Sequence, residues 1–99
     1  MKPKKPAPQQ ASEHFLYEAI ASIHTADQAK AFLEDLCTPT ELQALVDRWL
    51  VVPHLLAEKP YRAIHQETGV SVTTIGRVAR ALNLGTGGYK KVFEQMKKK

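Results

Sequence analysis

Apolar residues recur at helical spacing along most of this 99-residue chain, and no segment shows the sustained alternation of a half-buried strand. Proline, glycine and capping residues divide the pattern into six segments, of which the first begins near Ser12. Its apolar stripe consists of Phe15, Leu16, Ala19, Ile20 and Ile23. The second segment follows Thr25, which forms a capping-box pattern with Gln28. The spacing therefore predicts an all-α protein with six helices.

The third segment has the strongest start signal and the widest apolar face. Thr38 is placed to cap a helix, Pro39 suits the first helical position and Glu41 can reach back to the cap. The apolar face consists of Leu42, Leu45, Val46, Trp49, Leu50, Val52 and Leu56. This width predicts a central scaffold helix. Because an interior proline removes a backbone hydrogen bond, Pro53 predicts a kink or an early helix end.

Ionisable residues divide the chain into basic ends and an acidic middle. Residues 1–11 hold three lysines, three prolines and no large apolar residue except the initiator, which predicts a disordered basic arm. Residues 13–58 carry eight acids against two bases, and residues 59–99 carry nine bases against two acids. The +7 charge of this last segment is typical of a surface that binds a polyanion, and the alternative is an ordinary solvated surface.

Residues 60–82 contain two helical patterns joined by a short turn. Pro60 opens the first helix, Gly69 supplies the turn and Ser71 caps the second helix. Four apolar residues are placed to hold the helices together: Ile64, Val70, Ile75 and Val78. This arrangement predicts a helix-turn-helix, whose second helix lies in the major groove of double-stranded DNA. An ordinary helical hairpin with a polar face is the alternative.

The outward face of the second helix carries groups suited to DNA. Its members are Thr73, Thr74, Gly76, Arg77 and Arg80. Arginine can donate two hydrogen bonds to guanine, threonine offers a hydroxyl and a methyl group, and glycine permits close backbone approach. Lys59, Arg62 and the N-terminus of this helix are expected to contact phosphates.

Over residues 12–82 the chain resembles the tryptophan repressor family, particularly its tryptophan-repressor-like relatives in bacteria. The resemblance is carried by Thr38-Pro39-Thr40-Glu41, Ala44-Leu45, Arg48, Leu55-Leu56, Gly69, Thr74-Ile75, Arg77 and Leu82. It implies an intertwined homodimer that reads a palindromic operator as a transcriptional repressor. Residues 12–58 would then form the dimerisation core, residues 60–82 the helix-turn-helix and residues 88–97 a C-terminal helix.

The resemblance also implies a pocket for a small-molecule effector beside the second helix of the motif. Its matching residues are Thr38, Arg48, Thr74 and Arg77. Val78 and Ala81 stand where the family has a glycine and a serine, which argues against tryptophan as the effector. Trp49 is interpreted either as a core residue or as a built-in indole that fills the slot. No other cofactor is implied.

Assigning Arg77 to the effector side changes the expected DNA contacts. Thr73 and Arg80 become the candidates for reading bases. The rim of the interface would then consist of Ser71, Gly76, His65 and Arg62, with Lys59 on a phosphate.

Two other classes of function compete with DNA binding. Catalysis or metal binding is disfavoured, because the four histidines and Cys37 lack paired ligand spacing and residues 85–88 follow no strand. The stronger alternative is a protein-interaction module that dimerises and binds an acidic protein partner. A single cysteine excludes an internal disulfide, and no apolar run is long enough for a membrane span, so a cytoplasmic protein is expected.

Overall fold

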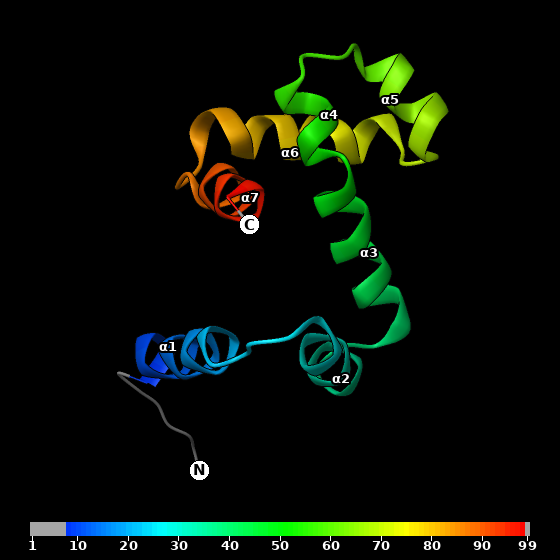
Figure 1. Cartoon of the computed structure of the whole chain (residues 1–99). Helices are drawn as coiled ribbons and strands as arrows, with labels where there is room; N and C mark the ends of the chain where they lie inside the picture. The colour runs from blue at the N-terminus through cyan, green and yellow to red at the C-terminus, as the bar shows by residue number, and fades with distance from the viewer. Residues whose placement is uncertain (1–7, 99) are drawn as a thin grey trace. The chain divides into compact units, whose positions relative to one another are not determined.

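The computed structural model describes residues 8–98, and this part of the chain is helical with no strand (Figure 1). Its helices are α1 (Pro8–Ala21), α2 (Ala26–Leu36), α3 (Pro39–Leu50), α4 (Val52–Leu56), α5 (Tyr61–Thr68), α6 (Val72–Leu84) and α7 (Gly88–Lys97). All six predicted segments are helical, and the third comprises α3 and α4. The all-α fold class is therefore confirmed.

Helix α1 begins earlier than the apolar stripe suggested. It starts at Pro8, so the predicted arm over residues 1–11 is wrong for residues 8–11, while residues 1–7 lie outside the described part. Proline is favourable at the first helical position, and glutamine and alanine are good helix formers. The side-chain amide of Gln9 also donates to the Glu13 carboxylate at 2.9 Å, one turn further on. These local preferences extend the helix without any apolar contact.

The described residues of the first unit, 8–38, hold α1 and α2, which bury none of their described side chains. Thr25 accepts a hydrogen bond from the backbone N–H of Gln28 at 3.1 Å, which confirms the predicted cap. The Gln28 side-chain oxygen accepts from the N–H of His24 at 3.0 Å, one residue before the Thr25 N–H that a capping box would use as the donor. Phe15 is 76% exposed, so this unit presents apolar surface rather than a core.

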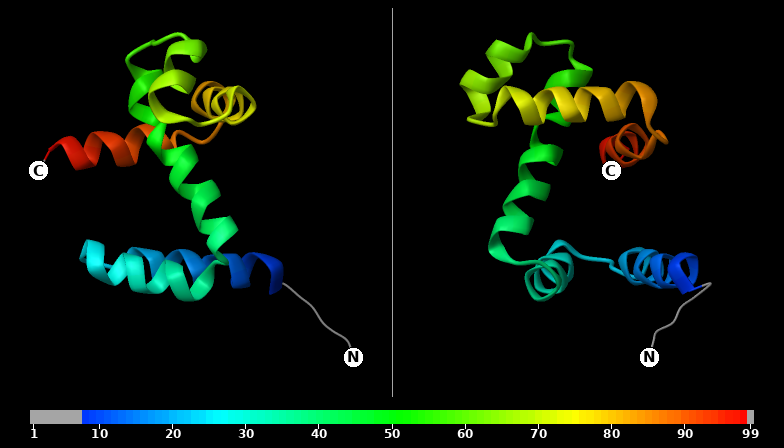
Figure 2. Two further views of the ribbon diagram at one scale, coloured as in Figure 1. Left: turned by 90° about the vertical axis from the view of Figure 1, so that its right-hand side faces the viewer. Right: turned by 180° about the vertical axis from the view of Figure 1, so that it is seen from behind.

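The core lies in the second compact unit, residues 39–99, of which residues 39–98 are described (Figure 2). Its fully or almost fully buried members are Val51, Val52, Ile64, Val70, Ile75 and Val78. These residues come from the α3–α4 segment and from both helices of the predicted motif. The scaffold segment thus packs with residues 60–82 in a unit that begins at Pro39. The dimerisation core expected over residues 12–58 stays a prediction.

The interruption predicted at Pro53 is present. Helix α3 ends at Leu50, and α4 begins at Val52 with Pro53 in its first turn. A proline at this position costs no helical hydrogen bond, because the first N–H groups of a helix have no partner within it. Val51 and Val52 at the break are completely buried, so the change of direction places two valines in the core.

Helix α4 ends in a Schellman motif whose left-handed residue is Glu58. The N–H of Glu58 donates to the Leu55 carbonyl at 2.9 Å, and the N–H of Lys59 donates to the His54 carbonyl at 3.2 Å. Glu58 has φ of 61°, the only positive φ among the described residues that are not glycine. A side chain bearing Cβ is disfavoured here by roughly 1–2 kcal/mol.

Replacing Glu58 with glycine should therefore stabilise the protein. We expect Glu58→Gly to raise the free energy of unfolding by about 0.5–1 kcal/mol, since relief of strain exceeds the added freedom of the unfolded chain. Urea denaturation followed by circular dichroism measures the change. Glu58→Ala is the matched control, because it removes the carboxylate but keeps Cβ. An equal gain in both variants would show that charge, not backbone strain, is the cause.

Candidate nucleic-acid interface

The turn between α5 and α6 is made by Gly69. This residue has φ of 78°, in the left-handed region, and its N–H donates to the His65 carbonyl at 2.8 Å. Ser71 then caps α6 by accepting from the N–H of Thr74 at 3.1 Å. Both predicted roles are confirmed. Together they set where α5 stops and where α6 starts.

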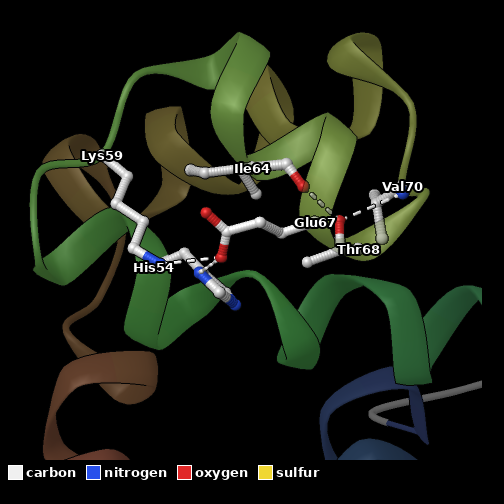
Figure 3. Close-up of polar contacts among 6 residues, drawn as sticks. All are labelled: His54, Lys59, Ile64, Glu67, Thr68 and Val70. Carbon is white, nitrogen blue, oxygen red and sulfur yellow. Dashed lines mark hydrogen bonds and ion pairs between the residues drawn. The ribbon is translucent and has the colours of Figure 1, made fainter.

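Two side chains of α5 add hydrogen bonds that hold this turn. The Thr68 hydroxyl donates to the Ile64 carbonyl at 2.7 Å and accepts from the Val70 N–H at 3.1 Å (Figure 3). His65 Nδ1 lies 2.7 Å from the Val70 carbonyl and is the donor, because a carbonyl oxygen only accepts. Sequence reasoning missed the role of Thr68. The available signal was a threonine in the last turn of a helix, where its hydroxyl can reach the carbonyl four residues back.

Helix α6 separates a buried face from an exposed one. Its buried residues are Ile75, Val78 and Ala79. Thr73, Arg77 and Arg80 are exposed, and their spacing of four and three residues places them on one side of the helix. Gly76 flanks them and is half-buried. These four residues, Thr73, Gly76, Arg77 and Arg80, lie on or beside one side of α6, and we call them the outward stripe.

The burial of Thr74 and of Val72 differs from what the helical spacing of α6 predicts. Thr74 is half-buried, and its hydroxyl accepts from Ser71 at 3.1 Å, so its side chain supports the cap rather than the outward stripe. Val72, three residues before the buried Ile75, has the spacing of a residue on the apolar face of α6 but is 50% exposed. It lies in the first turn, at the edge of the buried face, where α6 has begun but little packs over it. Periodicity alone does not reveal such an end effect.

The predicted phosphate contacts fall into two groups. Arg62 and His65 are exposed on α5. Lys59 instead has a partner within the chain: its Nζ lies 2.8 Å from Oε1 of Glu67, and His54 Nδ1 lies 3.7 Å from the same oxygen. The hydrogen bond from Lys59, followed by its charge, lowers the pKa of the Glu67 carboxyl, and His54 contributes less. Glu67 is therefore ionised at neutral pH, and its negative charge offsets the positive charge of Lys59.

Trp49 packs on the C-terminal helix. Its indole stacks on Tyr89 with ring centroids 6.1 Å apart and meets the edge of Phe93 at 6.4 Å. All three rings pack against the buried cluster. Trp49 is half-buried and packs on the core, and its alternative interpretation as a built-in indole in an effector slot stays a prediction.

Of the residues expected around an effector, Arg48 is half-buried on α3, Thr74 is half-buried on α6 and Arg77 is exposed on α6. The effector pocket stays a prediction. Within residues 8–98 no group of three or more histidine, cysteine or acidic residues is placed to hold a metal ion. No helix of the described part is both long and apolar enough to cross a membrane.

Helix α5, its glycine turn and α6 with its outward stripe define a helix-turn-helix protein. Residues 11–97 match the family model of the Trp repressor protein. The chain belongs to the Trp repressor family, whose members are DNA-binding regulators and not enzymes. This confirms the resemblance seen in the sequence.

Individual relatives agree with this assignment. The chain is 37% identical over 82 residues to the uncharacterised protein YerC of Bacillus subtilis (strain 168), covering 83% of this chain and 79% of the relative. It is similar to the crystal structure of a TrpR-like protein from Eubacterium eligens ATCC 27750, with a TM-score of 0.78, 42% identity and coverage of 88% and 89% of the two chains. A protein from Staphylococcus aureus, provisionally assigned as a Trp repressor, gives a TM-score of 0.82 at 33% identity, with coverage of 88% and 87%.

The hydrogen bonds of Thr68 should stabilise the motif measurably. Thr68→Val keeps the shape of the side chain but removes both bonds and leaves the Val70 N–H without this partner. We expect it to lower the free energy of unfolding by about 1–2 kcal/mol in urea denaturation. Thr68→Ser, which keeps the hydroxyl, should lose much less. If the two variants were equally destabilised, the methyl group and not the hydroxyl would be the stabilising element.

Proposed function

We propose that this chain is a sequence-specific DNA-binding transcriptional regulator, acting as a repressor in the cytoplasm, and that it reads a palindromic operator as a homodimer. The observation that carries the proposal is the outward stripe of α6, which presents two arginines and a threonine from a helix-turn-helix of the Trp repressor family. The stripe lies within a segment of net charge +7. Such a surface suits both phosphates and the base edges of the major groove.

The exposed residues suggest a division of roles. Thr73 in the first turn of α6 and Arg80 two turns later would read bases, and Gly76 between them would allow the helix backbone to approach the DNA. Arg62 on α5 would contact phosphates, and His65, whose Nδ1–H donates to the Val70 carbonyl, would lie at the rim of the interface. Ser71 contributes through the α6 N-terminus, since its hydroxyl is used in the cap. Arg77 lies on the same side of α6 as Arg80. This location favours a contact between Arg77 and DNA, in addition to the effector role that the family implies.

The homodimer is supported by the unit formed from residues 1–38. Its exposed large apolar side chains are Phe15, Leu16, Tyr17, Ile20 and Leu36. A monomer would leave these side chains in water, at a cost of roughly 25 cal/mol for each Å² that a partner would otherwise cover. A second copy is the partner that the family implies, and two copies would present paired α6 helices to an operator of matching symmetry.

Duplex DNA selected from a random pool provides the test. The wild-type protein should bind as two chains per site, and the logarithm of its affinity should fall with that of the salt concentration by roughly 0.9 per contacted phosphate. Arg80→Ala should relax base preference, at a cost of about 1–3 kcal/mol on the preferred site only. Arg62→Ala is the matched control and should weaken all sequences alike. An acidic protein surface as the true ligand would give no preferred duplex.

We further propose that tryptophan is not required as a corepressor. Val78 is 1% exposed and belongs to the buried cluster, so its side chain fills the interior where the family has a pocket glycine. Calorimetry should therefore detect no binding of free tryptophan, and operator affinity should be unchanged by it. Micromolar binding would contradict the blocked pocket. Val78→Gly is the informative variant, because it would reopen space at this position.

A further inference from the structure

Residues 59–99, which carry the net charge of +7, contain only two acids, and one of them forms an ion pair with a base of the same segment. Glu67, on α5 of the helix-turn-helix, accepts from Lys59 through a single oxygen that also faces His54 (Figure 3). Lys59 lies just before α5, and Arg62 lies in the first turn of the same helix. Both bases are therefore at the end of α5 where exposed N–H groups attract anions. Of the two, Lys59 forms an ion pair with the carboxylate of Glu67 in the same chain.

We propose that Glu67 competes with DNA for Lys59 and so limits the affinity of the protein for its operator. In the free protein Lys59 is paired with Glu67, and on DNA it exchanges this partner for a phosphate. The inference deepens the proposed DNA-binding function and rests on it. It assigns Glu67 the role of an affinity-determining residue that does not itself contact DNA.

Three features of the cluster make the exchange feasible. The side chains are open to solvent, with Lys59 38% and Glu67 49% exposed, so a phosphate can reach the ammonium group. Exposed ion pairs of this kind are weak, and breaking one is easily offset by a charged hydrogen bond to phosphate. His54 is 22% exposed and stays 3.7 Å from Glu67, so the carboxylate keeps a neighbour that can donate to it after Lys59 leaves.

The experiment measures operator affinity across a salt series for four proteins: wild type, Glu67→Gln, Lys59→Gln and the double variant. Glu67→Gln keeps the size of the side chain and removes its charge. We expect it to tighten binding by about two- to fivefold at moderate salt. Because Lys59 contacts its phosphate in both proteins, the salt slope of Glu67→Gln should stay close to that of the wild type, whereas Lys59→Gln should lower it by up to about 0.9. In the Lys59→Gln background the same change should have little effect.

Glu94→Gln is the matched control for net charge. Glu94 is the other acid of residues 59–99 and lies on α7, outside this cluster. If Glu94→Gln tightens binding as much as Glu67→Gln, or if Glu67→Gln acts equally without Lys59, general electrostatics would explain the effect and the proposal is overturned. Unchanged or weaker binding by Glu67→Gln also overturns it. Failure of the proposed function is distinct, because then the wild-type protein itself would show no salt-dependent binding to duplex DNA.

Discussion

The buried aliphatic cluster is the interaction on which the rest of the described second unit depends. Val51 and Val52, at the break between α3 and α4, meet Ile64 of α5 and Ile75 and Val78 of α6. Each is almost completely removed from water, which stabilises a fold by roughly 1.5–3 kcal/mol per side chain before conformational entropy is counted. Because one cluster joins scaffold and motif, the direction in which α6 faces follows from the packing of α3 and α4.

The short turn adds what packing alone does not specify. Gly69 allows the left-handed conformation, Thr68 ties the end of α5 to Val70, and Ser71 fixes the first turn of α6. Side chains on a helix turn by about 100° per residue, so a cap displaced by one position would redirect every contact. The outward stripe therefore depends on hydrogen bonds located before the helix, although none of these groups belongs to the stripe.

Much of this arrangement could be predicted from the sequence, because the decisive residues act locally. Pro53, Gly69 and Ser71 each restrict the backbone through their own chemistry, and their effects are seen at their own positions. The misplaced features depend on neighbours or chain ends. The exposure of Val72 reflects what packs over the first turn of α6, and the partner of Lys59 lies eight residues away across a fold of the chain. Neither the exposure of Val72 nor the ion pair of Lys59 can be predicted from the helical spacing of apolar residues.

The two compact units differ in how their apolar side chains are buried. Residues 39–98 bury an aliphatic cluster, whereas the described residues of the first unit bury nothing and hold large apolar side chains in water. In the proposed homodimer the same association would cover this surface and set the separation of the two α6 helices. Folding, assembly and operator binding would then be linked, since whatever binds the dimer also stabilises it by mass action. In such a dimer the correct spacing of the two α6 helices would depend on the same association that covers the apolar surface of α1 and α2.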